Sequence, residues 1–220
     1  WVDKILASVN TENITVVRLM DFVDAKEEEH SEGMEEEERE KEHAYDEHIW
    51  TSPANALLLV DAVASAVSEV DPENAELYAA NAADYKALIT ELQEDFAELA
   101  QSAAQKTFIV ADRFPFLYFA DEFGLDYFAA FPACSAHNDI SGQTLAFLIN
   151  KIQELDVKCV YYIELSNQNV ARTLAEETGC QTALLHSCQS VAADEFNAGA
   201  TYVSLMRANL ASLAIALGNG

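Results

Sequence analysis

Apolar residues recur along this chain with two different periods, and the change between them divides it into regions. In residues 1–9 they are spaced for one face of a helix, and the apolar run 14–19 predicts a short buried strand. Ser52 followed by Pro53 is a favourable helix start. Residues 72–105 have no internal Gly or Pro and predict one helix of about 50 Å, long enough to brace two parts of a protein.

From residue 106 onward, short apolar runs alternate with helical patterns. This alternation predicts an α/β fold with a parallel sheet that is covered on both faces. We expect strands at 107–111, 127–131, 159–163 and 182–185, and helices at 114–123, 142–155, 167–178 and 198–217. Ligands of such sheets bind beyond the carboxyl ends of the strands. Those ends are marked by Asp112-Arg113, Pro132-Ala-Cys134, Glu164-Leu-Ser166 and His186-Ser-Cys188-Gln189.

An acidic segment, residues 24–47, separates the N-terminal patterns from the first long helix. It holds 13 acidic and 3 basic residues, a net charge of −10, and almost no apolar residues. Because it has so little to bury, we expect a mobile loop. His30 and His43 lie among its carboxylates, and imidazole and carboxylate are ligands for zinc and related ions. The segment is therefore a candidate metal-gathering loop, although an ordinary solvated acidic loop has the same composition.

The acidic balance extends over the whole chain of 220 residues, in which 38 Asp and Glu stand against 12 Lys and Arg, a net of −26. Such a surface repels nucleic acid and anionic lipid and attracts cations. The length allows one large domain or two small lobes. The chain begins at Trp1 within an amphipathic pattern and without a basic leader, so we expect a missing N-terminal portion.

Four cysteines lie in the last 90 residues: Cys134, Cys159, Cys180 and Cys188. None belongs to a C-x-x-C pair, which argues against a zinc ribbon and against a thioredoxin-type redox site. Two disulfides in an oxidising compartment and four thiols in a reducing one are both consistent with the count.

His48 is the strongest single candidate for chemistry, although a lone His at such a boundary is equally often a hydrogen-bonded packing residue. It lies in Asp46-Glu-His48-Ile-Trp50-Thr-Ser-Pro53, directly before a capped helix. This D-x-H-x-W-x-S-P pattern, with the acidic loop before it and the long helix after it, resembles the zinc and manganese solute-binding proteins of ABC importers. Further segments agree with a zinc-binding branch of that family: 112–120, 131–136, 162–166 and 185–189. The resemblance covers residues 1 to 217.

The resemblance implies two parallel-sheet α/β lobes bridged by one long helix, with the metal held between the lobes. Residues 1–71 would then be the remainder of the N-terminal lobe, incomplete in this chain, residues 72–105 the bridging helix, and residues 106–220 the C-terminal α/β lobe. The implied function is extracytoplasmic capture of a divalent transition metal and its delivery to the membrane subunits of an ABC importer. Zinc is favoured over Mn²⁺, which prefers more carboxylates and fewer histidines. A monomer is expected, either periplasmic or anchored as a lipoprotein.

Two other classes of function compete with this one. A metal-dependent hydrolase needs an open coordination position and a general base, and the sequence has no H-E-x-x-H or similar motif, so we do not expect an enzyme. A surface or adhesion-type protein with the same fold and a degraded metal site is the alternative, because two ligand positions are altered.

The family's ligands transfer to this chain only in part. His48 matches the second ligand, and the early His ligand of the family lies upstream of Trp1. The third position falls on Arg113, which cannot bind metal while protonated, and the fourth falls on Gln189, a weak oxygen ligand. The substitutes on offer are His43, His30, His137 and His186, followed by Glu164, Cys134 and Cys188. For His186 a buried, backbone-bonded strand residue is favoured over a ligand, and for His137 an exposed loop residue is equally consistent.

Two pairings are expected around these positions. A guanidinium at the lobe interface repels Zn²⁺ unless a carboxylate neutralises it, so we expect an ion pair between Arg113 and Glu164. An extracytoplasmic location favours disulfides, and we expect Cys134–Cys188 and Cys159–Cys180, each joining the same end of neighbouring strands.

Overall fold

The centre of the protein is a four-stranded parallel sheet with the strand order β2-β1-β3-β4. A computed structural model describes residues 2–10, 12–35, 45–135 and 139–218. The strands are β1 (Thr107–Arg113), β2 (Asp126–Phe131), β3 (Cys159–Tyr162) and β4 (Gln181–Leu184). Each begins and ends within two residues of the range expected from the sequence. The prediction of a parallel α/β sheet is confirmed.

Helices cover both faces of this sheet. Alternate strand residues point to opposite faces, so each strand contributes to two hydrophobic cores. Phe108 and Val110 of β1 belong to the hydrophobic core on one face, together with α4 (Leu117–Phe123) and α8 (Tyr202–Leu217). Ile109 belongs to the core on the other face, with α5 (Gly142–Glu154) and α6 (Asn169–Thr178). A short helix, α7 (Ala193–Asn197), precedes α8. All three of these β1 residues are completely buried, which explains their uninterrupted apolar run.

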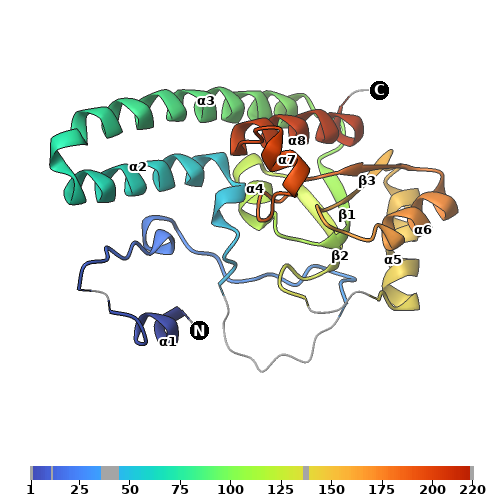
Figure 1. Ribbon diagram of the computed structural model, residues 1–220. Helices are drawn as coiled ribbons and strands as arrows, with labels where there is room; N and C mark the ends of the chain where they lie inside the picture. Colours follow the sequence, from blue (N-terminus) through green and yellow to red (C-terminus); the bar gives the residue numbers. More distant parts are fainter. Residues whose placement is uncertain (1, 11, 36–44, 136–138, 219–220) are drawn as a thin grey trace.

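A long helical hairpin extends from this α/β unit (Figure 1). It consists of α2 (Pro53–Val70), the 3₁₀ turn η3 (Pro72–Asn74) and α3 (Ala75–Ser102). Ile89 of α3 packs against Ala56 of α2, whereas Leu92 and Phe96 belong to the core of the sheet. The single long helix expected at 72–105 is therefore α3 with a 3₁₀ turn before it. This helix packs both on α2 and on the core of the sheet.

The first helix of the hairpin is unusually apolar. By length and composition α2 is one helix in the described part of the chain that qualifies to cross a membrane, and only 17% of it is buried. Core helices of soluble proteins pass the same test. Asp61 of α2 also makes an ion pair with Lys86 of α3 at 2.5 Å, so this helix carries a charge at its middle that α3 neutralises.

The strand expected at 14–19 is wrong. The described chain begins with α1 (Val2–Leu6), residues 14–18 have no regular secondary structure, and Leu19–Phe22 form the 3₁₀ turn η1. Ile14 and Val16 are about half exposed, at 56% and 45%. An apolar run becomes a strand only where a neighbouring strand satisfies its backbone N–H and C=O groups, and within the described residues no strand or bridge includes this run.

The expectation of a mobile loop over the whole of 24–47 is also wrong. Residues 24–35 cross the edge of the α/β unit as a packed strap. The backbone N–H of Lys26 donates to Tyr118 Oη at 3.0 Å, and the backbone N–H of Glu35 donates to Ala130 O at 3.0 Å. The side chain of Met34 is 6% exposed and belongs to the core. Residues 36–44, which include His43, lie outside the described part.

Gly33 shows how closely this strap approaches the helices behind it. Its φ is +82°, and a Cβ added there would lie 2.2 Å from the ring of Phe147 in α5. Only glycine satisfies both the left-handed backbone and the lack of space. One buried Met, one Gly and a few backbone hydrogen bonds therefore order a segment whose overall composition resembles a solvated loop.

Replacing Met34 with Ala tests whether the strap packs. Removing this buried side chain should lower the free energy of unfolding by about 2–5 kcal/mol, because the contacts of the thioether chain are lost and a cavity remains. The measurement is urea unfolding followed by circular dichroism. Glu32→Ala, two residues away on the exposed side of the strap, is the control and should change stability by less than about 0.5 kcal/mol. Equal free energies of unfolding for the two variants would show that the strap does not pack, as expected of a mobile loop.

Candidate metal site

His48 lies where the segment after the strap turns into the helical hairpin. It is followed by the 3₁₀ turn η2 (Ile49–Thr51), and its backbone carbonyl accepts from Thr51 Oγ1 at 2.8 Å. Ser52 then caps α2 by accepting from Asn55 N at 3.1 Å, and Pro53 occupies the first helical position. The motif read from the sequence is thus a turn that positions a histidine, followed directly by a helix N-terminus.

Asp46 fixes the orientation of the imidazole. Its Oδ1 lies 2.8 Å from Nδ1 of His48 and also accepts the backbone N–H of His48 at 2.8 Å. Both side chains are buried, at 2–3% exposure. A carboxylate on Nδ1 holds the proton there and leaves Nε2 as the nitrogen with a lone pair for a metal ion.

The surroundings of His48 shift its acidity. Burial is the largest single influence and lowers the pKa of His48. The hydrogen bond and the charge of Asp46 raise it, with further contributions from Glu47 and from a hydrogen bond with Gln189. The net result is a pKa above the ordinary value of the imidazole.

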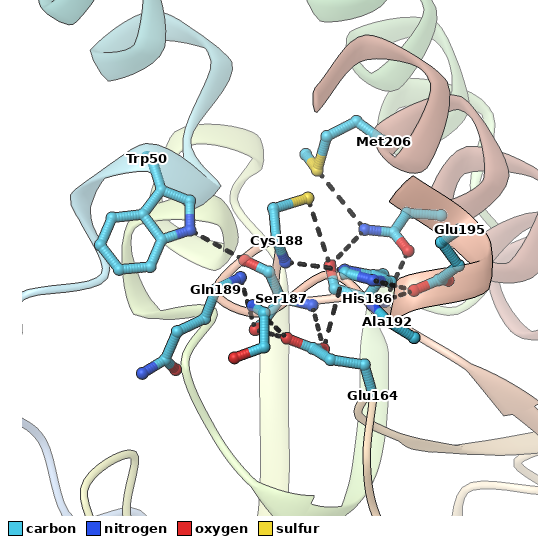
Figure 2. Close-up of polar contacts among 11 residues, drawn as sticks. Trp50, Glu164, His186, Ser187, Cys188, Gln189, Ala192, Glu195 and Met206 are labelled. Carbon is cyan, nitrogen blue, oxygen red and sulfur yellow. Dashed lines mark hydrogen bonds and ion pairs between the residues drawn. The ribbon is translucent and has the colours of Figure 1, made fainter. Parts of the chain in front are cut away.

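The loop after β4 forms the opposite side of the site. Trp50 Nε1 donates to the carbonyl of Ser187 at 2.9 Å, which joins this loop to the segment that carries His48 (Figure 2). Asp46 occupies Nδ1 of His48, and a hydrogen bond with the side chain of Gln189 is among the influences that raise the pKa of this ring. The position that resembles the fourth ligand of the family therefore lies close to His48.

His186 belongs to the support of this loop. Its backbone N and O both bond to the Asn209 side chain, at 2.7 Å each, and its Nδ1 accepts the N–H of Cys188 at 2.9 Å. Its Nε2 has no hydrogen-bond partner within the described residues and lies 3.7 Å from Glu195 Oε2. These contacts agree with the interpretation of His186 as a buried, backbone-bonded residue, and its role as a metal ligand stays a prediction.

The expected ion pair between Arg113 and Glu164 is wrong. Arg113 Nε donates to the carbonyl of Ser135 at 2.6 Å, and its guanidinium lies 3.7 Å from Asp112 Oδ1. Glu164 instead accepts from the backbone and hydroxyl of Ser187. Backbone N–H groups of the loop after β4 satisfy this carboxylate, so it does not need the guanidinium.

The expected disulfides are wrong as well, since Cys134, Cys159, Cys180 and Cys188 are all thiols outside any disulfide bond. Cys134 follows β2 and Cys188 follows β4, and these strands are the two opposite edges of the sheet. Cys159 and Cys180 do lie at neighbouring strands, yet as separate thiols. Burial, with the charges of Glu164 and Glu195, raises the pKa of the Cys188 thiol to about 12. A thiol that stays protonated is a poor metal ligand.

Of the three remaining histidine candidates, the structure describes only His30. His30 is exposed on the strap, and His43 and His137 lie outside the described residues. Within the described ranges, no three His, Cys, Asp or Glu side chains come together as a metal cluster. The site that the structure assembles thus consists of one oriented imidazole and one facing amide.

Asp46, Trp50 and Glu122 are functional neighbours whose roles sequence reasoning missed. Glu122 of α4 accepts from Ser52 Oγ at 2.5 Å and from Ala54 N at 3.2 Å, so it completes the cap of α2 from outside. Asp46 and Trp50 stood in the quoted motif, two residues on either side of His48, and that spacing was the available signal. Glu122 had none.

The fold and this site together define the class of the α/β solute-binding proteins. More specifically, the chain belongs to the family described as "ZnuA: Zinc-uptake complex component A periplasmic", which it matches over residues 1–216.

Two curated relatives give the extent of the similarity. The chain is 30% identical over 227 residues to the zinc-binding protein AdcA of Streptococcus pyogenes serotype M1, which covers 97% of this chain and 43% of that protein. It is 32% identical over 194 residues to the high-affinity zinc uptake system protein ZnuA of Bacillus subtilis (strain 168), covering 88% of this chain and 60% of that protein. The chain thus spans less than half the length of AdcA.

Solved structures agree with the fold. The metal-dependent lipoprotein YcdH from Bacillus subtilis superposes with a TM-score of 0.81 at 28% identity, covering 99% of this chain and 76% of that one. The Zn(II)-bound ZnuA-like domain of Streptococcus pneumoniae AdcA gives a TM-score of 0.79 at 26% identity, covering 100% of this chain and 76% of that one.

Asp46→Asn tests the orientation of His48. The amide keeps the shape of the side chain and removes its charge, so the pKa of His48 should fall from its raised value, as measured by NMR titration of the imidazole. Because protons compete with metal for the ring, metal binding by the unaltered chain should weaken as the pH falls through that raised pKa, and the variant should begin to weaken at a lower pH. Glu47→Gln removes a lesser influence on the ring and should shift the pKa less. An imidazole pKa that is the same in Asp46→Asn and the unaltered chain would exclude Asp46 as its partner.

Proposed function

We propose that this chain is the metal-capturing part of a zinc importer: it binds Zn²⁺ outside the cytoplasm and passes it to the membrane subunits of an ABC transporter. The observation that carries the proposal is the buried imidazole of His48, whose Nδ1 is held by the Asp46 carboxylate at 2.8 Å. Membership of the zinc-uptake family supports the same function. Zinc is cargo here, taken up and released, and not a resident cofactor.

The chemistry of the site fits a zinc ion only in part. A zinc-binding His usually donates its other ring nitrogen to a carboxylate, which fixes the orientation of the ring and raises its basicity. Zinc takes four ligands from N, O and S donors. His48 supplies one nitrogen and Gln189 offers an amide oxygen, which is weaker than a carboxylate. His43 and His137 remain candidates for further positions.

The charge of the chain supports capture of a cation. A net charge of −26 surrounds the site with negative potential, which raises the local concentration of divalent cations. Zinc is favoured over Mn²⁺ because the oriented group is an imidazole and not a further carboxylate. The relatives are named as a zinc-binding protein and as a zinc uptake system protein. These names describe binding and transport, so we propose no catalysis.

The remaining parts of the proposal concern place and partners. One of the relatives is a zinc-binding lipoprotein, AdcA of Streptococcus pneumoniae, which supports an extracytoplasmic location with a lipid anchor. We propose that α3 braces the α/β unit against an N-terminal lobe to which residues 1–71 belong, and that the protein acts as a monomer. An adhesion-type role with a degraded site is the competing function, and zinc affinity separates the two.

Replacing His48 with Ala is the direct test. Loss of the imidazole nitrogen should weaken zinc binding at least about tenfold, equivalent to about 1.4 kcal/mol, as measured by isothermal titration or chelator competition. His30→Ala is the matched control, because that ring is exposed on the strap, and its affinity should stay within about twofold of the unaltered chain. No measurable zinc binding by the unaltered chain would favour the adhesion-type alternative, and equal affinities of the two variants would remove His48 from the site.

A further inference from the structure

The loop between His186 and Ser190 has a backbone shape that needs support. Cys188 has a φ of +60°, in the left-handed region that residues other than glycine rarely adopt. Left-handed backbone at a non-glycine residue costs free energy and persists only where the surroundings enforce it. Polar contacts with neighbouring side chains surround this loop and hold it in that shape (Figure 2).

Glu164 provides the central support. Its carboxylate, at the end of β3, accepts from Ser187 N at 2.8 Å and from Ser190 N at 3.3 Å, and it also accepts the hydroxyl of Ser187. The side chain is only 8% exposed. A buried carboxylate is stable only if donors surround it, and hydrogen bonds to a charged acceptor are stronger than neutral ones. One side chain thus gathers the donors at both ends of the turn.

The same turn faces the metal site. The Ser187 carbonyl accepts from Trp50, two residues after His48, and Ser187 Oγ accepts the backbone N–H of Gln189 at 3.2 Å. The side chain of Gln189 in turn lies close enough to His48 to contribute to its raised pKa through a hydrogen bond. Ser187 and Gln189 therefore connect the Glu164 carboxylate to the surroundings of the imidazole, and Trp50 adds a second connection through the Ser187 carbonyl.

We propose that Glu164 is a positioning residue for zinc binding. Its carboxylate holds the 186–190 turn in the shape that presents Gln189 to His48, and the Trp50–Ser187 hydrogen bond keeps the two sides together. This inference rests on the proposed function, and it assigns to Glu164 neither metal ligation nor pairing with Arg113. Its effect on the metal is expected to pass through Gln189.

Glu164→Gln is the first variant for the test. The amide keeps one acceptor oxygen but places an NH₂ donor against the donors of the turn, so the turn should lose its shape. Zinc binding, measured by chelator competition well below the melting temperature, should weaken about tenfold, the usual effect of removing an outer-shell partner. Glu195→Gln is the matched control, because Glu195 bonds to Ala192 N at 2.9 Å and contacts the turn only at the ring of His186, 3.7 Å away, without accepting from any N–H or O–H of Ser187 or Ser190. Its zinc affinity should stay within about twofold.

A double-mutant cycle with Gln189→Ala separates positioning from general destabilisation. If Glu164 acts through Gln189, the two substitutions together should weaken zinc binding no more than the stronger of them alone, since coupled residues are not additive. Additive losses, or an unchanged affinity in Glu164→Gln, would overturn the inference. Failure of the unaltered chain to bind zinc would instead overturn the proposed function.

Ser187→Ala keeps the test decisive if Glu164→Gln does not fold. It removes one hydrogen bond to the carboxylate and the acceptor for Gln189 N–H, and leaves the rest of the carboxylate's donors in place. It should weaken zinc binding several-fold and show the same non-additivity with Gln189→Ala. The absorption spectrum of bound Co²⁺ should change in both turn variants and not in Glu195→Gln, and an identical spectrum in all three would also contradict the inference.

Discussion

The position of His48 depends on one short segment, residues 46–54, being held against the α/β unit from several sides. Tyr118 of α4 donates to the carbonyl of Asp46 at 2.7 Å, and Trp50 donates to the loop after β4. Glu122, also on α4, accepts from the first turn of α2. Because these anchors come from two different parts of the chain, the segment cannot shift without breaking contacts on more than one side.

This anchoring explains how a buried imidazole is kept with a defined orientation. Asp46 bonds the ring and the backbone of His48 with one oxygen, so rotation of the ring would break a charge-assisted hydrogen bond. Glu122 also accepts from Gln93 of α3 at 2.6 Å, which connects the beginning of α2 to the long helix. The segment that carries His48, the hairpin and the sheet are therefore held together around α4.

The sheet and its helices could be predicted from the sequence because buried parallel strands carry unbroken apolar runs. Phe108 to Val110 illustrate this, since all three are completely buried. The helix start at Ser52-Pro53 was predictable for the same kind of local reason, as cap and first-turn residues act within a few positions of one another. His48 itself was identified from its motif, and its partner Asp46 was part of that motif.

The errors share a physical cause, which is that they depended on contacts between distant segments. The acidic composition of the strap concealed Met34 and the backbone hydrogen bond to Ala130. The Cys134–Cys188 pairing assumed neighbouring strands, whereas the order of strands in a sheet does not follow from their order in the chain. Glu164 was given the wrong partner because its donors, Ser187 and Ser190, lie in the loop after β4, and a contact between two separate loops cannot be read from a sequence pattern.

The central claim is that Nε2 of His48 binds zinc while Asp46 holds Nδ1. X-ray absorption at the zinc edge of the metal-loaded chain tests it most directly. The account predicts a shell of nitrogen and oxygen at about 2.0–2.1 Å, with imidazole scattering that diminishes in His48→Ala. A sulfur shell at about 2.3 Å, or imidazole scattering unchanged by the substitution, would contradict it.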